Sequence, residues 1–141
     1  MWQYHEVLDP SFSIFFHSQP VVFASTRMSN NQVLLFVIVG RNEPLYEAEF
    51  HKRGGTASTP DATTRQNYFV LHSALDLVER AAWTTNRMHL GVIDKVNNQQ
   101  VSTFLTAGNI KFMLLHSGRS DDAIRNFFQD VYELYVKVSC P

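Results

Sequence analysis

A chain of 141 residues with 45% hydrophobic residues is long and apolar enough to fold as one domain around a substantial core. Its formal net charge of −1 gives no overall attraction to nucleic acid or to anionic lipid, so we expect no nucleic-acid partner. The single cysteine, Cys140, excludes an intramolecular disulfide, and no apolar run reaches the roughly 18 residues of a transmembrane helix.

Residues 1–32 differ in character from the rest of the chain. They hold several aromatic residues together with Pro10 and Pro20, but they show no steady periodicity. No basic segment precedes an apolar run, which argues against a signal peptide. We expect a poorly ordered N-terminal extension; the alternative is that the apolar residues around Phe12–Phe16 dock elsewhere or form an extra strand.

A β-hairpin is predicted to open the main domain. Residues 33–40 are too short and too rich in β-branched residues for an ordinary helix, which favours a central strand buried on both faces. A turn is predicted at Asn42-Glu43-Pro44, because proline fixes its own φ and keeps the residue before it out of the helical conformation. In the second strand, residues 45–50, apolar and acidic residues alternate. We therefore expect one face toward the core and the other, with Glu47, toward solvent.

A long helix is predicted after the loop of residues 52–60. Asp61, Thr63 or Thr64 is expected to cap its start, and it is expected to end near Trp83. Its apolar arc is wider than one core contact requires. That arc comprises Tyr68, Phe69, Val70, Leu71, Ala74, Leu75, Leu77 and Val78. One side of the helix is expected to pack on the sheet and another to be available to a partner, although a large core could absorb the whole arc.

Three strands and a final helix are predicted to complete the domain. The strands are expected at residues 87–96, 101–107 and 110–116, with a tight turn at Gly108-Asn109. Ser120 is expected to cap the last helix, whose first turn carries two aspartates. Its core stripe is Ile124, Phe127, Phe128, Val131, Leu134, Tyr135 and Val138. The order β-β-α-β-β-β-α predicts an α+β fold with a five-stranded, largely antiparallel sheet covered by helices.

The sequence offers few groups arranged for chemistry. The six histidines show no metal-ligand spacing, so no metal and no cofactor are predicted. His72 and Asp76 lie one helical turn apart, which is compatible with an oriented general base. Because no nucleophile is placed beside them, a hydrogen-bonded surface pair is the favoured interpretation. We therefore expect a protein that is not an enzyme.

Many residues in one collinear order resemble the sedlin family, the small, subunit 2-type subunits of the TRAPP vesicle-tethering complex. The matching segments are Phe36-Val37-Ile38-Val39-Gly40, Glu47-x-Glu49-Phe50, His72-x-Ala74-Leu75-Asp76-Leu77-Val78, Asp94-Lys95, Phe104-x-Thr106-Ala107-Gly108, Phe112-x-x-Leu115-His116 and Asn126-Phe127-Phe128-x-Asp130-Val131-Tyr132-x-Leu134-Tyr135. The resemblance covers about residues 33–139. It implies a longin or SNARE-like fold, similar to profilin, with a domain at residues 33–141.

Two departures from the family accompany this resemblance. The extension has no family counterpart, and sedlin-like chains continue into a further helix beyond the position of Pro141. We expect the missing helix to leave apolar surface exposed unless residues 12–24 fill the same groove.

The resemblance also implies a function. It is that of a non-enzymatic adaptor in a tethering complex that acts between the endoplasmic reticulum and the Golgi and supports nucleotide exchange on a Rab GTPase. The implied partners are other TRAPP subunits, indirectly the Rab GTPase, and SNAREs as further candidates. The implied location is cytoplasmic, peripheral to intermediate and cis-Golgi membranes. Two alternatives remain: a truncated isoform with impaired folding or assembly, and a small-molecule-binding module on the same fold.

Site residues follow from the same resemblance. Asp76 matches a family aspartate implicated in partner contacts, with His72, Glu79 and Arg80 beside it. The alternative for Asp76 is a solvated side chain or an ion pair with Arg80. The residues expected to serve the core are Ser102, Phe112, Phe127, Phe128 and Val131.

Overall fold

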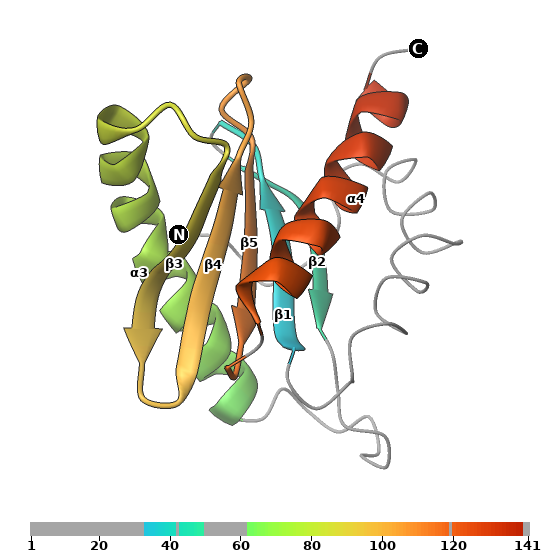
Figure 1. The fold of residues 1–141 in the computed structure, drawn as a ribbon. Coiled ribbons are helices and arrows are strands. Elements are labelled where there is room, and N and C mark those ends of the chain that lie inside the picture. Colours follow the sequence, from blue (N-terminus) through green and yellow to red (C-terminus); the bar gives the residue numbers. More distant parts are fainter. Residues whose placement is uncertain (1–32, 42, 50–61, 119, 140–141) are drawn as a thin grey trace.

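One antiparallel sheet between two helices forms the part of the chain that the computed structural model describes, residues 33–41, 43–49, 62–118 and 120–139 (Figure 1). In chain order its elements are β1 (Val33–Val39), β2 (Pro44–Glu49), α3 (Ala62–Thr84), β3 (His89–Val96), β4 (Gln99–Leu105), β5 (Lys111–His116) and α4 (Asp121–Ser139). The strand order is β2-β1-β5-β4-β3. This confirms the predicted α+β, longin-like fold. The extension predicted for residues 1–32 and its proposed groove filling lie outside the described residues.

Strand β1 lies inside the sheet, between β2 and β5, and its side chains alternate between two buried layers. Leu35, Val37 and Val39 join a core cluster beneath α3. Phe36 and Ile38 join a second cluster beneath α4. An unbroken apolar run of this length is what a strand covered on both faces requires.

The β1–β2 hairpin departs from the predicted pattern at Glu47. Glu47 pairs with Val37, and its side chain therefore lies on the α3 side of the sheet. It is half-buried there, and the Tyr68 hydroxyl donates a hydrogen bond to its Oε2 atom at 3.2 Å. Burial raises the pKa of Glu47 above its ordinary value. The expectation that this side chain points to solvent is wrong, because α3 covers that face.

The turns of the second half use asparagine in the left-handed region. Asn97 between β3 and β4 has a φ of 55°, and Asn109 between β4 and β5 has a φ of 63°. The predicted Gly108-Asn109 turn is present, but its positive φ falls at Asn109. Gly91 has a φ of 73° where β3 departs from regular pairing with β4, which suits glycine because it lacks a Cβ.

Both predicted helices form, and the N-terminal cap of the second is resolved. The backbone N–H of Ala123 donates to the Ser120 hydroxyl at 3.3 Å, which satisfies one donor of the first turn of α4. Helix α3 begins at Ala62, so Thr63 and Thr64 lie inside it and the expectation that either caps it is wrong. The third candidate, Asp61, lies outside the described residues.

Candidate docking surface

The outer face of α3 is the most distinctive surface of the described domain. Phe69, Asp76 and Trp83 follow one another at intervals of seven residues, which corresponds to two helical turns less about 20°. Their side chains therefore line one side of the helix, and we call these three residues the outer stripe. The stripe crosses most of a helix that runs from Ala62 to Thr84.

Both aromatic residues of the outer stripe are exposed to solvent. Phe69 is 67% exposed and Trp83 is 91% exposed, and Asp76 between them is also exposed. Single exposed apolar side chains are common on protein surfaces, but two large aromatic rings in register on one helix are more informative. Trp83 would bury a large area on contact with a partner, and residues of this type dominate the energetics of protein interfaces.

The inner face of α3 fixes the stripe in place. Its buried residues are Tyr68, Val70, Leu71, Ala74 and Val78, which pack against the sheet. Two side-chain hydrogen bonds add to this packing: Tyr68 donates to Glu47, and Gln99 Nε2 donates to Asn67 Oδ1 at 2.9 Å. The wide apolar arc predicted from the sequence thus divides into a buried side and, at Phe69, an exposed one.

Of the four residues predicted for the interface, Asp76 belongs to the outer stripe and the other three lie beside it. Asp76, Glu79 and Arg80 are exposed, and His72 is half-buried. Burial lowers the pKa of His72. Within the described residues no ion pair joins Asp76 to Arg80, so the alternative of an Asp76–Arg80 pair is not realised in this structure. Their contact with a partner stays a prediction.

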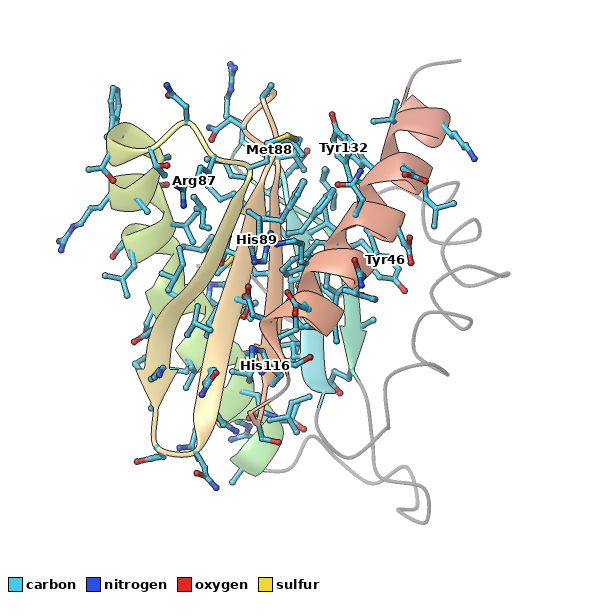
Figure 2. All side chains as sticks on the ribbon, in the orientation of Figure 1. Tyr46, Arg87, Met88, His89, His116 and Tyr132 are labelled. Carbon is cyan, nitrogen blue, oxygen red and sulfur yellow. The ribbon has the colours of Figure 1, made fainter. Side chains whose placement is uncertain are left out.

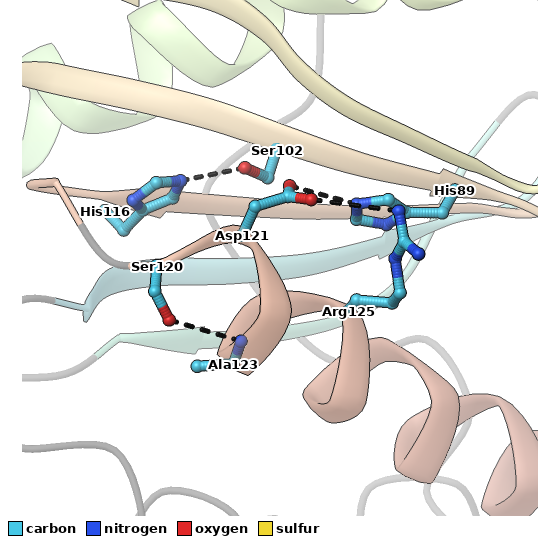
Figure 3. A network of polar contacts seen from close by, with 7 residues as sticks. All are labelled: His89, Ser102, His116, Ser120, Asp121, Ala123 and Arg125. Atoms are coloured by element: carbon cyan, nitrogen blue, oxygen red, sulfur yellow. Dashed lines mark hydrogen bonds and ion pairs between the residues drawn. The ribbon is translucent and has the colours of Figure 1, made fainter.

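A polar network lies on the opposite side of the sheet, under the first turn of α4 (Figures 2 and 3). His116 Nε2 and Ser102 Oγ are 2.8 Å apart, and both residues are fully buried. His89 Nε2 lies 3.1 Å from Asp121 Oδ1, and Arg125 approaches the other oxygen of the same carboxylate at 3.8 Å. Asp121 also lies in the first turn of α4, where the helix dipole favours a negative charge.

This network has the composition of a catalytic site but not its arrangement. In a serine–histidine–aspartate triad the carboxylate orients the same imidazole that accepts the serine proton. Here Asp121 contacts His89 at 3.1 Å and Arg125 at 3.8 Å, whereas Ser102 contacts His116. Ser102 and His116 are also 0% exposed, so no substrate reaches them. Of these contacts, His89–Asp121 joins α4 to β3, whereas Ser102–His116 joins β4 to β5.

The residues predicted for the core lie in the interior. Phe112, Phe127, Phe128 and Val131 belong to the cluster between the sheet and α4. Phe36 packs edge-on against Phe127 with ring centroids 5.1 Å apart, and Phe104 stacks on Phe112 at 5.6 Å. Ser102 lies beside this cluster as the partner of His116. A substitution at any of these positions is therefore expected to impair folding before it impairs binding to a partner.

Two other kinds of site are absent from the described ranges. No three histidine, cysteine, aspartate or glutamate residues there are grouped so as to hold a metal ion. Nor does any described helix combine the length and apolarity needed to cross a membrane.

Two features were not predicted from the sequence: the outer stripe of α3, and the positions of His89 and His116 under α4. The apolar pattern places Phe69 in one undivided arc and Trp83 at a helix end, although each lies seven residues from Asp76. His89 and His116 are far apart in the sequence, and only the pairing of β3, β4 and β5 brings both under α4. A search for seven-residue spacing in the first helix would have found the outer stripe.

The fold and its surface define a small longin-type α+β domain with an exposed aromatic and acidic helix face and a buried Ser102–His116 pair. The family model described as Sedlin matches residues 37–141, and the chain belongs to the sedlin family.

Three relatives illustrate the similarity. A probable trafficking protein particle complex subunit 2 of Caenorhabditis elegans is 39% identical over 103 residues, which cover 72% of this chain and 73% of the relative. The protein of the same description from Drosophila melanogaster is 41% identical over 105 residues, covering 74% of this chain and 75% of the relative. The transport protein particle 20 kDa subunit of Schizosaccharomyces pombe is 36% identical over 103 residues, covering 72% and 74%.

Proposed function

We propose that this protein is a non-enzymatic adaptor subunit of a trafficking protein particle (TRAPP) complex that tethers vesicles between the endoplasmic reticulum and the Golgi. The names of the relatives support membership of such a complex. The observation that carries the adaptor role is the outer stripe of α3, with Trp83 91% exposed. Exposed aromatic rings on a well-anchored helix suit capture of another subunit better than they suit chemistry.

The proposal assigns no chemical step to this chain. Its task is to present the face of α3, with His72, Glu79 and Arg80 at the edges of the outer stripe, to a neighbouring subunit. Nucleotide exchange on a Rab GTPase is then a property of the assembled complex, and any contact with SNAREs is made from within it. The chain acts from the cytoplasmic side, at intermediate and cis-Golgi membranes.

Reconstitution tests this proposal. The full chain, carrying an affinity tag, is co-expressed with the other subunits of a trafficking protein particle complex and analysed by size-exclusion chromatography. We expect co-elution with those subunits, together with Rab nucleotide exchange that the isolated chain does not support. The Drosophila relative, expressed with its own complex, serves as the positive control. Elution of the chain alone, while the control assembles, would overturn the proposal.

A further inference from the structure

Lys111, the first residue of β5, is the only buried aspartate, glutamate, lysine or arginine among the residues that the structure describes. It is 3% exposed, and no ion pair in the described part of the chain includes it. Lysine is rarely buried without a partner, because an ammonium group that loses water needs an anion or other acceptors in exchange. Lys111 therefore carries a charge that the described domain does not compensate.

The strands beside Lys111 offer it no acceptor side chain. Its lateral neighbours in the sheet are Val39 on β1 and Leu105 on β4, and both are apolar. Because Val39 belongs to the core cluster beneath α3, the stem of Lys111 packs on that side of the sheet. The amine is still reachable: the fully enclosed side-chain atoms without a hydrogen-bond partner in the described residues are His89 Nδ1 and Thr103 Oγ1, and Lys111 Nζ is not among them.

Two exposed arginines flank Lys111 at one end of the sheet. Arg41 follows β1 in the turn to β2. Arg87 precedes Met88, whose carbonyl accepts a 2.7 Å hydrogen bond from the N–H of Leu105, the β4 neighbour of Lys111. Figure 1 shows the β1–β2 turn, the β4–β5 turn and the loop before β3 at the same end of the sheet, and Figure 2 labels Arg87 there. We call Arg41, Arg87 and Lys111 the basic rim.

We propose that the basic rim binds an acidic segment of a partner subunit, with one aspartate or glutamate carboxylate against the amine of Lys111. A charge contact at a position with little water is screened less than one between fully exposed side chains. The inference rests on the proposed function, and it adds to the outer stripe a second contact surface, on the sheet rather than on α3.

The recessed position of Lys111 favours a protein carboxylate over the phosphates of a lipid or a nucleic acid. With 3% exposure, Lys111 admits only a slender group, such as a carboxylate at the end of a flexible side chain. A membrane or a duplex presents a broad anionic surface, which would meet the exposed Arg41 and Arg87 first and would also meet Glu43, exposed in the turn of Arg41. The net charge of −1 gives the chain no overall attraction to such a surface.

Zero-length cross-linking in the assembled complex tests the contact. A water-soluble carbodiimide joins a lysine amine to a carboxylate only where the two touch, and mass spectrometry identifies the linked peptides. We expect Lys111 of the full chain to link to an aspartate or glutamate within one segment of one partner subunit. Lys111→Arg keeps the charge without the amine, so it should lose this link while the complex still forms. A link to a second copy of this chain, or no link from Lys111 while other lysines react, would overturn the proposal.

Affinity measurements on charge variants give a second test. Lys111→Met removes the charge but keeps most of the apolar stem, so it should fold and yet weaken assembly about tenfold. Lys95→Met makes the same change at an exposed position on β3 and should assemble like wild type. Normal assembly of Lys111→Met would show that its amine has no partner, which overturns the proposal.

A variant of the exposed part of the basic rim keeps the test valid if Lys111→Met does not fold. Arg41→Gln combined with Arg87→Gln alters two exposed residues and should weaken assembly severalfold, and unchanged assembly would overturn the proposal. Binding of the isolated chain to phosphatidylserine vesicles that this double variant abolishes would assign the rim to lipid and overturn the choice of occupant. These outcomes leave the proposed function intact, because the wild-type chain still assembles. Failure of the wild-type chain to assemble at all would overturn both.

Discussion

The Ser102 hydroxyl and the His116 imidazole form a buried hydrogen bond of 2.8 Å between neighbouring strands. Ser102 pairs with Leu114 in the β4–β5 ladder, so His116 is its diagonal neighbour on the same face, under α4. Both residues are 0% exposed, and water cannot replace either partner. The bond therefore contributes to stability chiefly because leaving either group unpaired is costly.

Ser102→Ala should destabilise the domain. The substitution leaves the Nε2 atom of a fully buried imidazole without its hydroxyl partner. We expect a loss of about 1–3 kcal/mol in the free energy of unfolding, measured by urea denaturation. Ser73→Ala is the matched control, because Ser73 is exposed on α3 and its hydroxyl donates to the backbone oxygen of Phe69; it should change stability by less than about 0.5 kcal/mol. Equal effects of the two substitutions would contradict this account of Ser102.

Acid should weaken the domain through His116. Burial lowers the pKa of His116 below its ordinary value of 6.5, and the nearby charge of Asp121 opposes this shift in part. Between the two pKa values the unfolded chain binds more protons than the folded one. The contribution of His116 is therefore fully present above about pH 6.5 and is lost as the pH falls toward its folded value.

The measurement is the free energy of unfolding from about pH 7.5 to about pH 5.5, where one such group contributes at most about 1.4 kcal/mol per pH unit. His116→Asn removes the titrating group and should flatten this dependence. His72, whose pKa burial also lowers, is unchanged in the variant and accounts for part of any remaining slope. An unaltered slope in His116→Asn would show that His116 is not the sensitive group.

Substitutions at Trp83 and Phe128 should separate surface from core. Trp83 is 91% exposed, so Trp83→Ala should leave the free energy of unfolding within about 0.5 kcal/mol of wild type. Phe128 is fully buried between the sheet and α4, so Phe128→Ala should cost about 3–5 kcal/mol. Thermal melts followed by circular dichroism distinguish the two.

In an assembly assay Trp83→Ala should nonetheless weaken capture by about tenfold. A destabilised Trp83 variant, or one that assembles normally, would speak against the role given to this residue.

The elements were predictable from the sequence because each carries its own local pattern. The apolar run at residues 33–40 and the stripe from Ile124 to Tyr135 each had one simple interpretation, and both elements form where expected. The burial of the Glu47 side chain under α3 was not predictable in this way. Alternation along β2 separates its two faces but does not say that α3 folds over the acidic one.

The candidate site was predictable only in part, for a related reason. Asp76 and its neighbours followed from resemblance, and the exposure of Asp76, Glu79 and Arg80 agrees with a surface role that is still to be tested. The sequence did not show that Phe69 is exposed while its apolar neighbours on α3 pack against the sheet. Helical spacing alone does not decide which 100° of a wide apolar face meets the sheet. The Ser102–His116 contact required the strand order, which no local pattern contains.

The central claim is that the outer stripe of α3 captures a partner subunit, and charge reversal at Asp76 tests it most directly. The measurement is the affinity of the purified full chain for the remaining subunits of a trafficking protein particle complex. It compares wild type with Asp76→Arg and with Asp130→Arg, which makes the same charge change at an exposed position on α4. We predict that Asp76→Arg weakens binding about tenfold or more while circular dichroism shows a folded domain, and that Asp130→Arg binds like wild type. Equal binding by all three proteins would contradict the claim.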